Sequence, residues 1–101
     1  MGKSIEKMSK EELIQEVYRL SGLIHNPHID DFLESVRTEA AFQEETRNID
    51  DNHKSPFDWF WTCGYLCQKA ATSALAGDMV KAKHHTISTA ALMFNWFKRL
   101  E

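Results

Sequence analysis

Four polar side chains lie at helical spacing within the most apolar segment of the chain. In residues 55–76 (SPFDWFWTCGYLCQKAATSALA), Asp58, Thr62, Tyr65 and Lys69 follow one another at intervals of four, three and four residues. Side chains at such intervals share one face of a helix. An acid and a base in apolar surroundings are costly unless something charged meets them, so the pattern predicts a buried polar pocket on a core helix. The alternative is structural: Asp58 satisfies the start of the helix and Lys69 extends into solvent.

A second unusual carboxylate lies on the helix that we expect at residues 28–46. The buried side of its first half is formed by apolar residues, namely Ile29, Phe32 and Val36. In the second half Glu39 and Gln43 take the positions where further apolar side chains are expected. Either Glu39 points into a pocket as a metal ligand or a base, or the apolar contact ends before it and the helix end is solvated.

Capping and turn signals divide the chain into four helices and predict an all-α fold. The signals are a capping box at Ser9 and Glu12, a break at Asn26-Pro27, a polar loop at residues 47–54, a cap at Ser55-Pro56 and a turn at Gly77-Asp78. Asp58 is three residues after Ser55 and could complete a second capping box. The short turn at Gly77 makes helices three and four an antiparallel hairpin, which brings Lys69 nearer to Lys81 and His85.

The length of 101 residues allows one small domain. We expect residues 1–27 to form an accessory N-terminal helix and residues 28–100 to form the core. Helices three and four are apolar on more sides than a four-helix chain of this size can cover. We therefore expect a homodimer or a larger homo-oligomer that completes the bundle.

Composition excludes several classes of partner. The chain has 43% apolar and 27% charged residues and a net charge of −3. No Lys/Arg-rich face appears, so we expect no nucleic acid as partner. The apolar third helix carries Asp58 and Lys69, so we expect no membrane association. The sequence starts with an amphipathic helix and not with a leader peptide, which favours a cytoplasmic protein. Cys63 and Cys67 are expected to be core cysteines.

Three strings between Asp31 and Trp96, about two thirds of the 101 residues, resemble a known family. They read FLESVRTEAAFQ, KSPFDWFWTCGYLCQKA and GDMVKAKHHTISTAALMFNW. They are similar to the phage-encoded dATP/dGTP diphosphohydrolases, relatives of the MazG-like all-α nucleoside triphosphate pyrophosphohydrolases. The resemblance implies a MazG-like helical bundle in the cytoplasm of a phage host. It also implies hydrolysis of purine deoxynucleoside triphosphates to monophosphate and pyrophosphate, with Mg²⁺, or alternatively Mn²⁺, held by carboxylates.

The resemblance also assigns roles to individual residues. Glu39 and Asp58 would be catalytic and would bind the metal together with Asp51. The expected substrate-binding residues are Gln43, Lys54, Trp59, Trp61, Tyr65, Lys69, His85 and Asn95. Among these, the lysines and the histidine would meet phosphate oxygens, and a tryptophan would contact the base.

The chain departs from the family pattern near its carboxylates. Where the wider pattern has an acid three residues before Asp58, this chain has Ser55. A thinned carboxylate set favours an alternative function, in which the protein binds and sequesters a nucleotide or a host defence signal without hydrolysing it. A third alternative is a helical protein–protein interaction module whose polar residues are only structural.

Overall fold

The computed structural model describes residues 4–100, and these form helices only. The elements are a short 3-10 helix at Ile5–Lys7, α1 at Lys10–Ile24, α2 at Pro27–Asn52, α3 at Pro56–Leu75 and α4 at Met79–Phe97. The described residues contain no strand, which confirms the predicted all-α class. Residues 1–3 and 101, which the predicted domain includes, lie outside the described part of the chain. None of the helices within residues 4–100 is both long and apolar enough to cross a membrane.

The chain divides into two compact units, one ending at Asp31 and the other beginning at Phe32. The first unit contains α1, which buries none of its residues. Ser9 caps this helix, because its hydroxyl oxygen accepts a hydrogen bond from the Glu12 backbone N–H at 3.2 Å. Asn26 then caps α2 by accepting the backbone N–H of His28 at 2.8 Å. Both predicted helix starts are therefore confirmed.

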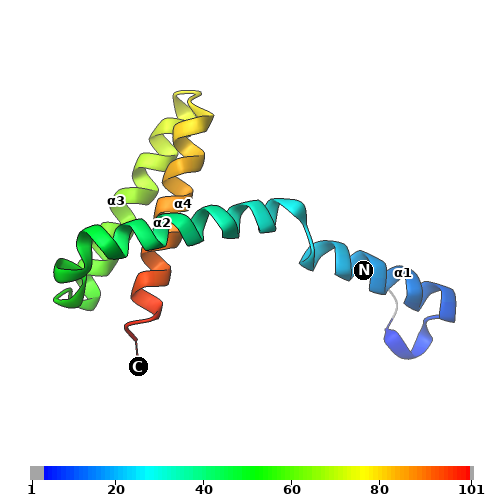
Figure 1. Ribbon diagram of the computed structural model, residues 1–101. Helices are drawn as coiled ribbons and strands as arrows, with labels where there is room; N and C mark the ends of the chain where they lie inside the picture. Colours follow the sequence, from blue (N-terminus) through cyan, green and yellow to red (C-terminus); the bar gives the residue numbers. More distant parts are fainter. Residues whose placement is uncertain (1–3, 101) are drawn as a thin grey trace. The chain divides into compact units, whose positions relative to one another are not determined.

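In the second unit, α3 and α4 pack side by side as an antiparallel hairpin (Figure 1). Ser55 and Asp58 form a reciprocal capping box at the start of α3, with Pro56 in the first turn. Gly77 ends the helix with a positive φ of 81°, a conformation that glycine adopts without strain. Asp78 then caps α4 by accepting the Lys81 backbone N–H at 3.1 Å. These signals confirm the predicted boundaries of the hairpin.

The C-terminal part of α2 crosses the hairpin on its α4 side (Figure 1). This helix continues to Asn52, so the predicted loop at residues 47–54 is wrong for residues 47–52. Polarity alone suggested a loop, but the segment contains no glycine or proline. Tertiary contacts also hold its last turn, since Asp51 is buried and Asn52 bonds to Arg99.

The core of the described residues is small and partly polar. Its buried apolar residues are Ala40, Trp59, Ala82, Ala91 and Leu92, and its buried polar residues are Gln43, Asp51, Ser88 and Asn95. On α3 only Trp59 is buried, so one chain leaves most of this apolar helix uncovered, in agreement with the expectation from its composition. Ile29 and Phe32 are exposed as well. Cys67 is also exposed, contrary to expectation, whereas Cys63 is half-buried and burial raises the pKa of its thiol.

Candidate functional site

A buried polar cluster joins α2 to α4 where the two helices cross. The Gln43 amide donates to the Ser88 carbonyl oxygen at 3.1 Å and to Glu39 Oε1 at 3.3 Å. The Asn95 amide donates to the Ala40 carbonyl oxygen at 3.3 Å. Gln43 Oε1 and Asn95 Oδ1 are buried and accept no hydrogen bond. The crossing therefore holds two acceptor oxygens that could bind a donor or a water.

A second cluster surrounds Trp59 at the start of α3. The Trp59 ring stacks on Trp96 of α4, with centroids 6.0 Å apart and an interplanar angle of 3°. Lys54 lies with its ammonium 4.7 Å from the Trp59 ring centroid and forms an ion pair with Asp51. Asp51 is 2% exposed, and its Oδ2 has no partner. These residues line an open cleft of about 400 Å³, where a stacked ring and a buried acid lie together.

Arg99 makes three hydrogen bonds, two of which tie this cluster to α2, a role that sequence reasoning did not assign to it. Its guanidinium donates to Asn52 Oδ1 at 2.9 Å, to the Asn95 carbonyl oxygen at 2.9 Å and to Glu44 Oε2 at 2.8 Å. The hydrogen bond from Arg99 is the main reason that the pKa of Glu44 lies below its usual value, and Lys98 adds to the effect. The i,i+4 spacing of Asn95 and Arg99 was visible in the sequence, but the α2 partners were not.

A third group of polar residues lines a cleft between α3 and α4 towards the hairpin turn. Tyr65 and Lys69 contribute from α3, and Lys81 and His85 contribute from α4, around an open volume of about 520 Å³. The Lys69 ammonium lies 4.6 Å from the centroid of the Tyr65 ring. This grouping confirms the prediction that Lys69 lies nearer to Lys81 and His85. Within residues 4–100, no acidic side chain forms an ion pair with Lys69 or Lys81.

Asp58, Tyr65 and Lys69 are exposed, so the prediction of a buried polar pocket along this face of α3 is wrong. Asp58 takes part in the capping box instead. Its Oδ2 accepts the Ser55 backbone N–H at 2.9 Å, and this bond is the main reason that its pKa lies below the usual range. The structural alternative for Asp58 is thus present. Trp61, a predicted base contact, is exposed on α3 and meets Phe60 edge to face.

The structure therefore distributes the predicted site residues over several places. Near the crossing of α2 and α4 lie Glu39, Gln43 and Asn95. Around the stacked rings lie Asp51, Lys54 and Trp59. In the hairpin cleft lie Tyr65, Lys69 and His85. Among the described residues, no three His, Cys, Asp or Glu side chains gather in a way that could hold a metal ion. The three expected metal ligands Glu39, Asp51 and Asp58 are not brought together within one chain.

Comparisons of this chain with protein-family models, with curated proteins and with solved structures find no match. The resemblance to the diphosphohydrolase family stays a prediction from the sequence strings.

Proposed function

We propose that this protein binds a purine deoxynucleoside triphosphate and, with Mg²⁺ or Mn²⁺, hydrolyses it to monophosphate and pyrophosphate. The observation that carries the binding half is the hairpin cleft. It places Lys69, Lys81 and His85 around one opening beside the Tyr65 ring. Phosphate oxygens are strong acceptors for such donors, and an aromatic face can stack on a base.

The ionic state of the cleft supports an anionic ligand. Within the described residues of one chain, Lys69 and Lys81 have no carboxylate partner, so neither charge is neutralised within that chain. The lining adds neutral donors and acceptors from α3, namely Gln68, Thr72 and Ser73. A triphosphate would supply the negative charge that the cleft lacks.

The hydrolytic half rests on the family resemblance. The metal would activate a water and offset charge on the α-phosphate. The carboxylates of a single chain do not fit this task as they stand, because no group of three acids forms within residues 4–100. One oxygen of Glu39 accepts a hydrogen bond from the Gln43 amide, and one oxygen of Asp58 accepts a hydrogen bond from the Ser55 backbone N–H. We derive no catalytic step through a metal from these positions.

A second candidate function is nucleotide binding without hydrolysis, as in a protein that sequesters a nucleotide or a host defence signal. The capping box favours it, since Asp58 has a structural role that explains its presence without chemistry. The same cleft would bind the ligand in both cases.

The experiment is a panel of purine and pyrimidine nucleoside triphosphates, each with Mg²⁺ or Mn²⁺. Binding is measured by calorimetry and products are identified by chromatography. Monophosphate plus pyrophosphate supports hydrolysis, and binding without products supports sequestration. Absence of both binding and turnover refutes both functions, and the remaining alternative is then a helical protein–protein interaction module.

A matched pair of variants on α4 locates the site. Lys81→Gln removes one cation from the cleft, whereas Lys83→Gln removes an exposed cation from the same helix that does not line it. A charge-assisted hydrogen bond is worth about 1.5–3 kcal/mol, so Lys81→Gln should weaken binding by roughly 10- to 100-fold. Lys83→Gln should bind like the unaltered protein. Equal losses in both variants would mean a diffuse charge effect and no site at the cleft.

A further inference from the structure

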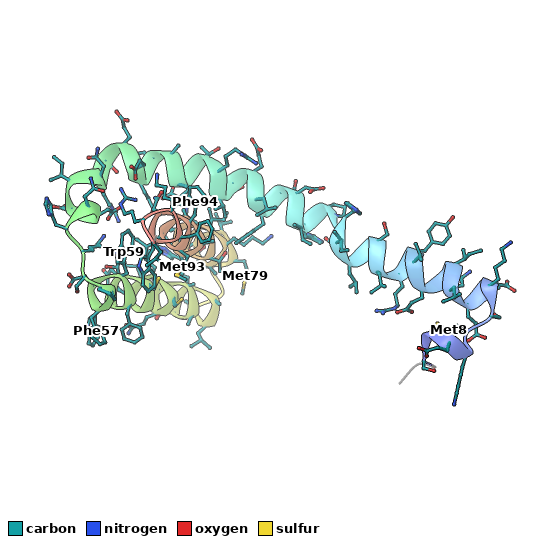
Figure 2. The ribbon with its side chains drawn as sticks, turned by 90° about the horizontal axis from the view of Figure 1, so that it is seen from below. Met8, Phe57, Trp59, Met79, Met93 and Phe94 are labelled. Carbon is teal, nitrogen blue, oxygen red and sulfur yellow. The ribbon has the colours of Figure 1, made fainter. Side chains whose placement is uncertain are left out.

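An uncharged stripe of exposed residues runs the length of α3 on the side away from α4, with Gln68 reaching the edge of the hairpin cleft. It consists of Phe57, Trp61, Gly64, Gln68, Ala71 and Leu75. Phe57, Trp61 and Leu75 are 76%, 72% and 91% exposed. Figure 2 shows Phe57 on this outer side of the helix and Trp59 on the inner side. Apolar faces of this size on soluble proteins mark interaction sites.

We propose that a second copy of this chain covers the stripe, with the two α3 helices antiparallel across a two-fold axis at Gly64. The stripe follows a seven-residue repeat, in which Phe57, Gly64 and Ala71 form one row and Trp61, Gln68 and Leu75 form the other. Such a repeat keeps one seam facing a partner helix that crosses at about 20°. A two-fold axis makes the stripe its own partner.

Gly64 lies near the middle of this stripe, and the protomer itself does not require a glycine there. A Cβ added at this position meets no atom within 4 Å. Glycine in the middle of a helix is unfavourable relative to alanine, so its presence calls for a reason. Close approach of a second backbone is such a reason, because only glycine leaves that space open.

The exposed aromatic area of α3 supplies about half of what a dimer interface needs. An aromatic side chain offers about 150–250 Å². With the exposed fractions of Phe57, Phe60 and Trp61, these three rings leave roughly 400 Å² of α3 surface uncovered. Leu75 adds further apolar area. A stable interface buries about 800 Å² on each partner, and neighbouring polar residues at the rim supply the remainder.

Charge at the edge of the stripe fixes the antiparallel direction. Asp58 and Lys69 lie on the same flank of α3, six residues before and five residues after Gly64. A two-fold axis at Gly64 reverses the second helix and keeps its flank on the same side. Asp58 of one copy then lies beside Lys69 of the other, and the symmetry creates this pair twice. A parallel pairing has its two-fold axis along the helices and sends this flank to the opposite side of the seam in the second copy, so it forms no such pair.

This proposal does not depend on the proposed activity and is tested without nucleotide. Light scattering measures the mass of the protein and of Gly64→Glu over low micromolar concentrations. We expect the unaltered chain to show about twice its 11.7 kDa mass. Gly64→Glu places two carboxylates against each other at the axis, so its dimer dissociation constant should rise by at least about tenfold. A monomeric unaltered chain, or a dimer that Gly64→Glu leaves intact, overturns the proposal.

Two matched controls separate the interface from general effects. Gly22→Glu makes the same change at an exposed helical glycine of α1 that also has no atom within 4 Å of an added Cβ, and should leave the dimer unchanged. Lys69→Glu should weaken the dimer through repulsion from Asp58 of the second copy, whereas Lys81→Glu, in the same cleft but on α4, should not. Circular dichroism checks helicity. If Gly64→Glu loses helicity, the variant Gln68→Glu replaces it in the light-scattering test, because Gln68 is an exposed polar position of the stripe.

Discussion

Replacing Gln43 by Met tests whether packing or hydrogen bonding holds α2 on α4. The two side chains have similar shape and volume, so the substitution keeps the packing at a position that is 2% exposed. It removes the hydrogen bonds to the Ser88 carbonyl oxygen and to Glu39 Oε1, which contribute about 0.5–1.5 kcal/mol net each. It also removes the buried Oε1, which has no partner and costs about 1–3 kcal/mol. These opposing effects nearly cancel.

We therefore expect Gln43→Met to change the free energy of unfolding by no more than about 1 kcal/mol, in either direction. Gln43→Ala loses the same two hydrogen bonds and also leaves a cavity. Because of the cavity, it should be less stable than the Met variant by at least about 2 kcal/mol. Urea denaturation followed by circular dichroism measures both variants at one protein concentration.

If Gln43→Met is as unstable as Gln43→Ala, the expected near-cancellation is wrong. The polar contacts, and not the volume of the side chain, would then hold the crossing. Nucleotide binding supplies a second readout. A Met variant that is stable but no longer binds nucleotide would show that the Gln43 amide takes part in ligand binding.

Two further predictions concern the charged and capped positions. Ser55→Ala removes the hydroxyl that accepts the Asp58 backbone N–H, so thermal or urea unfolding should show a loss of about 1 kcal/mol. Glu44→Gln should cost about 0.5 kcal/mol at pH 7, a small value because the carboxylate is only half-buried. The pKa of Glu44 is lowered in the folded state, so its contribution is present above its ordinary pKa of about 4.3 and is lost as pH falls through the lower folded value. The difference in the free energy of unfolding between Glu44→Gln and the unaltered protein should therefore disappear on acidification. A difference that stays constant down to about pH 2 would contradict the ion-pair explanation.

Helix boundaries were predictable wherever a local chemical signal marks them. Ser9, Asn26 and Ser55 each use a side-chain oxygen to accept a backbone N–H of the following turn, and Gly77 supplies the positive φ that ends α3. These interactions involve residues within a few positions of one another, so they can be predicted from the neighbouring residues alone. The hairpin, and with it the grouping around Lys69, follows from the short turn at Gly77.

The end of α2 could not be predicted in the same way. Residues 47–52 are polar and give a weak local preference, and their helix is held by partners distant in sequence. Arg99 lies 47 residues from Asn52 and 55 residues from Glu44, so only the crossing of α2 and α4 brings them together. The burial of Gln43 and Asn95 has the same origin. Rotation of each helix about its axis decides such contacts, and hydrophobic periodicity fixes that rotation poorly on helices that are apolar nearly all round.

The capping role of Asp58 does not remove it from chemistry. A carboxylate has two oxygens and about four acceptor positions, and the Ser55 backbone uses one of them. The hairpin cleft has cations and an aromatic ring but no carboxylate in its lining. In the proposed antiparallel dimer, Asp58 of one copy lies beside Lys69 of the other and so brings an acid to the edge of that cleft. Nucleotide binding therefore needs only one chain, whereas hydrolysis with a metal held by carboxylates would belong to the dimer.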